Sequence, residues 1–458
     1  MGKRWKAIAL LMGAGMAAGR GAAQELPAAP APRIMLVAQV QGTAGADAAS
    51  GNRMTRQEAE DIAVKNNPRI GVSTLLALAE KQRTREARAD LLPTLNGNVT
   101  GVAAEEGSRI SSGTIDASRM LNHVGAGLEL RQLITNFGKT TNLTAAAALR
   151  ARASDAEAQA TREEIVLAAD LAYYGALEAQ ASERVAESTV AERQTVRDQV
   201  AALAASKLKS TLDLSFADVG LSEAKLLRLD ARNQADSAMA ELEEVLGTAA
   251  PSWGWQLVSE DGGEEAELPE TAEALVAQAM QERPDLQGLG LSHAADVRTS
   301  RAERAQLLPT VSGVGVVGTI PVGSSTYFQP SWYGAAGVNI EVPLFSGFRL
   351  QAEASEAALR ARASDEATRE LRDRITRDVR TAWLGAETAR ERMTVTGQLL
   401  AEASKALELA QTRYRLGLSS IVELSQAELQ QTEAAMSEAK ARLEWEAALA
   451  TVRFATGG

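Results

Sequence analysis

The chain has 458 residues, a formal net charge of −11 at pH 7 and only 4% aromatic residues. The acidic balance argues against a nucleic-acid partner, because proteins that bind nucleic acids carry basic surfaces. The absence of cysteine excludes disulfides and thiolate metal sites. Abundant Ala, Leu, Glu and Arg favour long helices with small side chains at their contacts.

Residues 1–23 are typical of a secretory signal peptide. Lys3 and Arg4 belong to a basic start, Ala7–Ala18 form an apolar centre, and small residues precede Gln24. The alternative is an uncleaved apolar terminus. We therefore expect the protein to be exported from the cytoplasm.

The rest of the chain is internally duplicated. The string ALRARASD occurs at Ala148–Asp155 and again at Ala358–Asp365, an offset of 210 residues. Upstream, Leu91–Thr94 matches Leu307–Thr310 with an offset of 216. A unit of this size is too long for an ordinary solenoid repeat. The expected organisation is a flexible leader over 24–52, a first structural repeat over 53–247, an acidic linker over 248–270 and a second structural repeat over 271–458.

Each repeat contains two segments in which polar and apolar residues alternate, which predicts β-strands. The expected strands cover residues of about 95–103, 123–133, 311–319 and 335–343. One face of the second strand in each repeat is apolar and consists of Val124, Ala126, Leu128, Leu130, Ala336, Val338, Ile340 and Val342. The opposite face carries Glu129, Arg131, Asn339 and Glu341.

Proline placement predicts very long helices. All twelve prolines lie outside the tracts 94–250 and 344–458, and an interior proline costs a helix about 3 kcal/mol. Each tract breaks once, at 207–210 and at 416–419. The expected helices cover residues of about 140–206, 211–246, 348–415 and 420–455, and the longer ones would each span about 100 Å.

This duplicated order of helix, hairpin, long helix and returning helix resembles the TolC family of outer-membrane efflux proteins. The resemblance includes the helix breaks at Asn67-Pro68 and Arg283-Pro284, the segment Pro343–Gly347 and the tip segment Tyr414–Glu423. It implies a mainly α fold with a membrane β-barrel portion, in which a homotrimer forms a channel-tunnel. It also implies a periplasmic adaptor protein and an inner-membrane transporter as partners, in multidrug efflux or in type I protein secretion.

Physical reasoning agrees with a membrane barrel built from several chains. Four strands leave two unpaired edges, and unpaired backbone groups are costly in lipid, so only a closed barrel is viable. A barrel needs about eight strands, which requires at least two chains. The number three comes from the resemblance. The apolar strand face is then expected to contact outer-membrane lipid, and the polar face to line the lumen.

The resemblance further implies a periplasmic gate at the helical tips, with the candidate residues Tyr414, Gly417, Glu423 and Asp213. Tyr414 would donate its phenolic hydrogen to a neighbouring chain, Gly417 would form the turn, and Glu423 would belong to an acidic ring. Ser419 stands where a linking arginine can occur, and Gln426 where a second acid can. Alternatively, Glu423 and Asp213 are first-turn acids favoured by the helix dipole.

Catalysis and cofactors find no support. His123 and His293 are the only histidines and lie in different contexts, and no serine or acid sits in a nucleophile motif. We therefore expect a channel in the outer membrane of a Gram-negative bacterium, extending into the periplasm, with no cofactor and no enzymatic activity. The alternative is a secreted periplasmic coiled-coil scaffold without a pore.

Overall fold

A computed structural model describes residues 53–102, 123–248, 255–258, 268–269, 271–319 and 332–458. The expected signal peptide and leader, most of the acidic linker and both hairpin loops lie outside the described residues. The first repeat contains β1 (Arg53–Met54), α1 (Arg56–Asn66), α2 (Pro68–Ala89), β2 (Thr94–Val102), β3 (His123–Thr135), α3 (Lys139–Ala205) and α4 (Thr211–Leu246). After β4 (Gln256–Leu257), the second contains α5 (Ala272–Glu282), α6 (Pro284–Ala305), β5 (Thr310–Thr319), β6 (Trp332–Glu341), α7 (Arg349–Arg415) and α8 (Ile421–Thr456).

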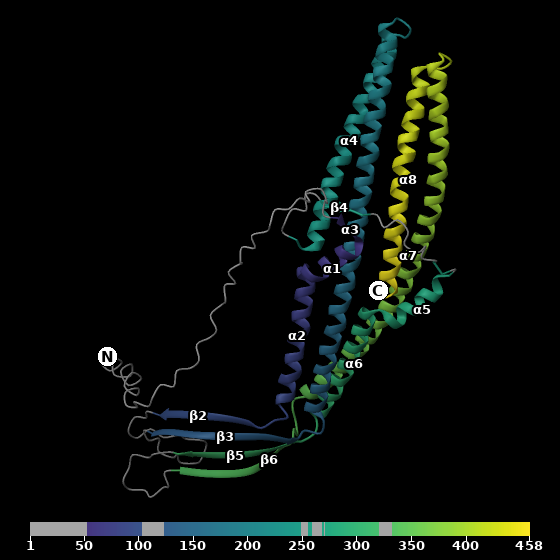
Figure 1. The fold of residues 1–458 in the computed structure, drawn as a ribbon. Coiled ribbons are helices and arrows are strands. Elements are labelled where there is room, and N and C mark those ends of the chain that lie inside the picture. Colours follow the sequence, from purple (N-terminus) through teal and green to yellow (C-terminus); the bar gives the residue numbers. More distant parts are fainter. Residues whose placement is uncertain (1–52, 103–122, 249–254, 259–267, 270, 320–331) are drawn as a thin grey trace, which may run out of the picture. The chain divides into compact units, whose positions relative to one another are not determined.

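The duplicated order expected from the sequence is confirmed (Figure 1). Helices α3 and α7 each have 67 residues, and α4 and α8 each have 36. At 1.5 Å per residue the two longest helices each span about 100 Å. Both returning helices pack against the outgoing helix of their own repeat, so each repeat forms a long helical hairpin.

Local sequence signals explain where the shorter helices begin. Thr55 and Glu58 form the capping box that starts α1: the Thr55 side chain accepts a hydrogen bond from the Glu58 backbone, and the Glu58 carboxylate accepts one from Thr55. Pro68 then separates α1 from α2, because proline is tolerated at the first position of a helix but not inside one.

Helix α3 lies at the centre of the helical packing. It contacts α2 and α6 on the side of the sheet, and α4 and α8 on the side of the tips, while α7 packs against α6 and α8 (Figure 1). Alanine is the commonest of its buried residues, at six of fourteen, and its small side chain allows neighbouring backbones to approach closely. Gly288 of α6 shows how close: a Cβ there would lie 3.3 Å from the Ala153 carbonyl oxygen.

The two repeats end their returning helices in the same way. The Asn67 side chain donates to the Val245 carbonyl at 2.8 Å, and the Arg283 side chain donates to the Ala455 carbonyl at 3.2 Å. These are the residues that precede the two matched prolines. Each stabilises a carbonyl that the helix leaves without a helical partner.

A glycine follows each of these helix ends, with φ +65° at Gly247 and +111° at Gly457. A Cβ on Gly247 would lie 2.8 Å from the Asn66 carbonyl oxygen. Only glycine satisfies both the left-handed backbone and this close approach.

We expect Gly247→Ala to destabilise the protein by about 2 kcal/mol or more, because the left-handed backbone alone costs about 1–2 kcal/mol and the added methyl meets backbone. Gly175→Ala, inside α3 with nothing within 4 Å of its Cβ position, is the control. It should be stabilising by up to about 1 kcal/mol, since alanine favours helix. Thermal unfolding in mild detergent measures both, and equal shifts would contradict this account.

Matched aromatic residues of α3 and α7 form hydrogen bonds with backbone carbonyls of short segments that lie outside the long helices. The Tyr173 hydroxyl lies 2.8 Å from the Met54 carbonyl oxygen and 2.7 Å from that of Val258, next to the parallel pair of β1 and β4. In the second repeat, Trp383 donates from Nε1 to the Pro269 carbonyl at 2.9 Å. Both long helices therefore use the same position for this contact.

A charged cluster around the buried Asp170 joins α1, α3 and α8. The Asp170 side chain is only 3% exposed and lies 3.4 Å from the Arg56 guanidinium and 3.8 Å from that of Arg453. Glu60 pairs with Arg56. Burial, together with a hydrogen bond and charge repulsion from Asp170, raises the pKa of Glu60 to about 7.

This cluster predicts a pH-dependent stability. Between pH 4.5 and 7 the folded protein keeps a proton on Glu60 that the unfolded chain has released. The folded state therefore loses stability relative to the unfolded chain as the pH rises through this range. Glu60→Gln should therefore raise the melting temperature at pH 8 and leave it almost unchanged at pH 4. Asp61→Asn, which removes an exposed neighbouring carboxylate, is the control. Parallel pH profiles for wild type and Glu60→Gln would exclude this role.

Candidate functional site

The four longer strands form one antiparallel sheet in the order β2-β3-β5-β6. Residues that lie directly opposite each other in neighbouring strands point to the same face. Leu128 is opposite Gly97 and Val317, and this register assigns every strand residue to a face.

The register collects the apolar candidates on one face of the sheet. In β3 and β6 this face carries Val124, Ala126, Leu128, Leu130, Ala336, Val338 and Ile340, and Val342 directly follows β6. Leu128 is 48% exposed and Val338 65%, so the chain itself does not cover them; the Val124 side chain lies outside the described residues. The face therefore needs a partner that is not in the chain.

The opposite face is polar and carries Glu129, Arg131, Asn339 and Glu341. Glu129 and Arg131 form an ion pair on β3. The pattern of β5 was not predicted residue by residue: it places Val314 and Val316 on the polar face and Gly313 and Gly315 on the apolar one. Its alternation of valine and glycine indicates a strand but not which face is apolar.

At the other end of the helices, both tips turn in the same way. Gly417 has φ +75°, and Lys207, its counterpart in the first repeat, has φ +61°. Leu418 N–H donates to the Arg413 carbonyl at 2.8 Å, and Leu208 N–H donates to the Leu203 carbonyl at 2.9 Å. This is the Schellman ending of a helix, so the structure places Gly417 in a turn that requires a left-handed residue.

The two candidate acids, which are counterparts in the repeats, make different contacts. The Asp213 carboxylate accepts a hydrogen bond from Ser210 N–H at 3.3 Å and completes a capping box at the start of α4. The Glu423 carboxylate instead lies 3.3 Å from the Arg413 guanidinium, and its side chain is 46% exposed. Asp213 therefore stabilises its helix start, whereas Glu423 remains near the surface in an ion pair that the sequence reasoning did not foresee.

Tyr414 is buried between the two tips and only 6% exposed. It packs in a cluster with Val200 of α3, Ala217 of α4 and Leu424 of α8. Among the described residues its hydroxyl has no hydrogen-bond partner. Burial raises the pKa of the Tyr414 phenol, and the negative charge of Asp213 adds to the effect. In this conformation the hydroxyl is not at the surface, where a neighbouring chain could accept its proton.

Two open grooves border these helices. One, of about 730 Å³, lies beside Tyr414 and is lined by Val196, Val200 and Gln411 among others. The other, of about 770 Å³, lies between α7 and α8 and is lined by Arg377, Gly385 and Glu444 among others. Neither shows the convergent set of titratable groups that a catalytic pocket would have.

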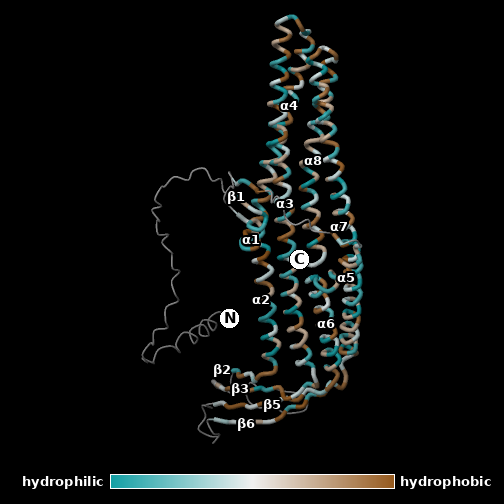
Figure 2. Tube along the Cα trace, turned by 45° about the vertical axis from the view of Figure 1, so that its right-hand side comes forward, coloured by the Kyte–Doolittle hydropathy of each residue, from teal (hydrophilic) through white to brown (hydrophobic). Residues whose placement is uncertain are grey.

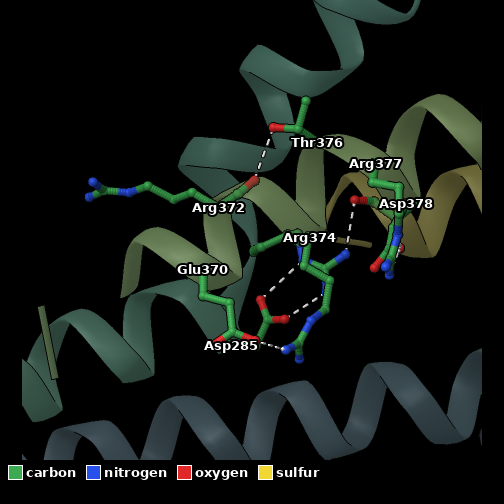
Figure 3. Close-up of polar contacts among 9 residues, drawn as sticks. Asp285, Glu370, Arg372, Arg374, Thr376, Arg377 and Asp378 are labelled. Atoms are coloured by element: carbon green, nitrogen blue, oxygen red, sulfur yellow. Dashed lines mark hydrogen bonds and ion pairs between the residues drawn. The ribbon is translucent and has the colours of Figure 1, made fainter. Parts of the chain in front are cut away.

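Several charged side chains on α7 pair with neighbours on the same helix. Figure 3 shows Glu370 next to Arg374 and Arg377 next to Asp378, while Arg372 extends away. The nitrogen–oxygen distances of these two ion pairs are 2.7 Å and 2.6 Å. His293 of α6 contacts Ser364 of α7 at 3.1 Å. Across the described ranges, no group of three or more His, Asp or Glu side chains could hold a metal ion.

The helices themselves are mixed in polarity. Figure 2 shows hydrophobic and hydrophilic residues alternating along them. None of the helices in the described part of the chain combines the length and the hydrophobicity that a transmembrane helix requires.

Comparisons with known proteins agree on one family. The sequence model of the outer membrane efflux protein family matches residues 61–248 and 275–458. Outer membrane protein OprJ of Pseudomonas aeruginosa is 26% identical over 368 residues, which cover 78% of this chain and 74% of OprJ. Outer membrane protein TolC of Salmonella enteritidis is 23% identical over 409 residues, covering 86% and 79%.

A crystal structure of CusC, described in terms of transmembrane channel formation, superimposes with a TM-score of 0.77 at 20% identity and covers 88% of this chain and 92% of CusC. The duplicated helical hairpins and the two-faced sheet thus occur in a known fold. Since the family match spans most of both repeats, the chain belongs to the outer membrane efflux protein family and is an outer-membrane efflux channel that extends into the periplasm.

Proposed function

We propose that three copies of this chain form a closed channel-tunnel whose barrel crosses the outer membrane. The observation that carries this proposal is the sheet, which has an exposed apolar face and ends in two edge strands, β2 and β6. Pairing β6 of one copy with β2 of the next would satisfy both edges and close a ring. Three copies would supply twelve strands, the number that the family resemblance implies.

The helices support the same head-to-tail contact. One outer side of the helical part consists of α2 and α4, which pack against α3. The other outer side consists of α7, which packs against α6 and α8. Both sides expose large apolar residues, including Leu75 at 67%, Leu226 at 62% and Leu409 at 65%. Association of these two surfaces would remove the apolar area from water and extend the barrel as a helical tunnel.

In this assembly the tips form the periplasmic entrance, and Tyr414, Gly417, Glu423 and Asp213 remain the gate candidates. A periplasmic adaptor and an inner-membrane transporter would deliver substrates there, as the family resemblance implies. Glu423 is the candidate for an acidic ring, because its side chain is exposed and does not cap its helix.

Leu128→Arg should impair trimer assembly, because a charge at a lipid-facing strand position costs about 2–4 kcal/mol. Chemical cross-linking in mild detergent should give three-chain species for wild type and fewer for Leu128→Arg, with Glu129→Leu as the control on the opposite face. If Leu128→Arg assembles normally and Glu129→Leu does not, the face that carries Glu129 contacts lipid and the face that carries Leu128 lines the lumen. A monodisperse wild-type monomer would exclude the assembly.

Replacing Glu423 by Ala should lower the cation preference of the channel in planar bilayers, because a ring of like charges concentrates cations at a narrow entrance. Arg413→Gln should raise the cation preference, since Arg413 neutralises part of the Glu423 charge in the wild-type protein. Both effects should be larger at low salt, where the Debye length is about 30 Å at 0.01 M and about 3 Å at 1 M.

The control is Glu433→Ala, an exposed acid on the same helix about 15 Å further along. Reversal potentials that do not change in Glu423→Ala, at either salt concentration, would identify Glu423 as only a first-turn acid.

A further inference from the structure

A single charged contact joins the aromatic residue of one tip to the turn of the other. The Lys209 ammonium lies 4.0 Å from the centroid of the Tyr414 ring. Lys209 belongs to the turn between α3 and α4, and Tyr414 to the last turn of α7. Lys209 is half-buried, whereas Lys207 in the same turn is exposed. The contact therefore connects the two repeats at their ends.

The internal duplication shows that this contact is one-sided. The counterpart of Lys209 in the second repeat is Ser419, and the counterpart of Tyr414 in the first repeat is Ala204. Each tip supplies one half of the pair. The first tip supplies the cation at the position where the second has none, and the Ser419 hydroxyl, also buried, has no hydrogen-bond partner among the described residues.

The face of the Tyr414 ring, and not its hydroxyl, makes the contact. An ammonium above an aromatic ring is attracted by the negative face of the ring, and partial burial strengthens this attraction. The hydroxyl is buried and unpaired, so it contributes no hydrogen bond to the junction. The ring also packs against Val200 and Leu424, and separating the tips would expose this apolar cluster as well.

We propose that Lys209 is a positioning residue that keeps the two tips of each chain together through the face of the Tyr414 ring and so favours the closed entrance. This inference rests on the proposed channel function and names the residue that controls its gate. Each chain would carry its own contact, so a closed trimer would hold three.

The decisive variants separate the charge, the ring and the hydroxyl. Lys209→Gln should raise the closed-state conductance in planar bilayers, with an opening equilibrium shifted about two- to fivefold per chain. Lys209→Arg should behave as wild type, because guanidinium also binds ring faces. Lys207→Gln, which removes the same charge two residues away, is the matched control and should have no effect.

Tyr414→Phe should also have no effect, whereas Tyr414→Leu should resemble Lys209→Gln. If Tyr414→Phe raises the conductance as much as Tyr414→Leu does, the hydroxyl forms the link and the proposal is wrong. The proposal also fails if Lys209→Gln behaves as Lys207→Gln does.

A distance measurement tests the contact independently of conduction. The chain has no cysteine, so spin labels at Leu208→Cys and Leu418→Cys, both in exposed positions, report the separation of the tips. Labelled chains are diluted with unlabelled ones to leave only distances within a chain. Lys209→Gln should broaden and lengthen this distance, and Lys207→Gln should not.

The conductance and spin-label measurements distinguish a failure of the channel function from a failure of the Lys209 contact. Wild-type protein that forms no pores in bilayers would contradict the channel function, while the label distances would still decide the Lys209 contact. Pores that form but do not respond to Lys209→Gln, with unchanged label distances, would contradict only the contact.

Discussion

The outer edges of β2 and β6 are the constraint on which the assembly depends. Among the described residues, these strands pair on one side only, and an unpaired backbone edge in lipid costs several kcal/mol for each free group. The exposed apolar face of the same sheet requires lipid rather than water. A single copy cannot meet both requirements, and in the proposed assembly other copies of the chain complete the barrel. The exposed leucines on both outer sides of the helices are consistent with the same contact between copies.

Comparison of the two repeats separates positions that have the same role in both from positions whose roles differ. Positions that stabilise the fold keep equivalent roles in both repeats: Asn67 and Arg283 cap the returning helices, and Gly247 and Gly457 end them. Positions at the tips have diverged. Asp213 caps a helix whereas Glu423 pairs with Arg413, so the repeats share a scaffold and differ where the proposed gate lies.

Much of the fold could be predicted because its signals are local. Thr55 and Glu58 lie three residues apart, and Pro68 acts on its own helix, so the sequence contains both helix signals in full. The alternation in β3 likewise assigns Leu128 and Glu129 to opposite faces without knowledge of the neighbouring strands. The proline-free tracts predicted the long helices for the same reason.

The candidate site was predicted less completely. The family resemblance named Tyr414 and Glu423, but it gave Tyr414 a hydrogen bond to another chain, whereas the hydroxyl is buried within its own. No sequence signal indicated Lys209, because a lysine in a turn is ordinarily a solvated charge. Its significance comes from a ring about two hundred residues away in the chain.

The sequence by itself therefore determined the duplication, the helix limits, the faces of β3 and β6, and the family, since each depends on spacing within one segment or on a repeated pattern. Only the tertiary structure decided which face of β5 is apolar, that Glu60 shares a charged cluster with Asp170, and that Lys209 covers Tyr414. These features depend on the register and separation of segments far apart in the chain. Packing of whole helices and strands sets that geometry, and no local pattern encodes it.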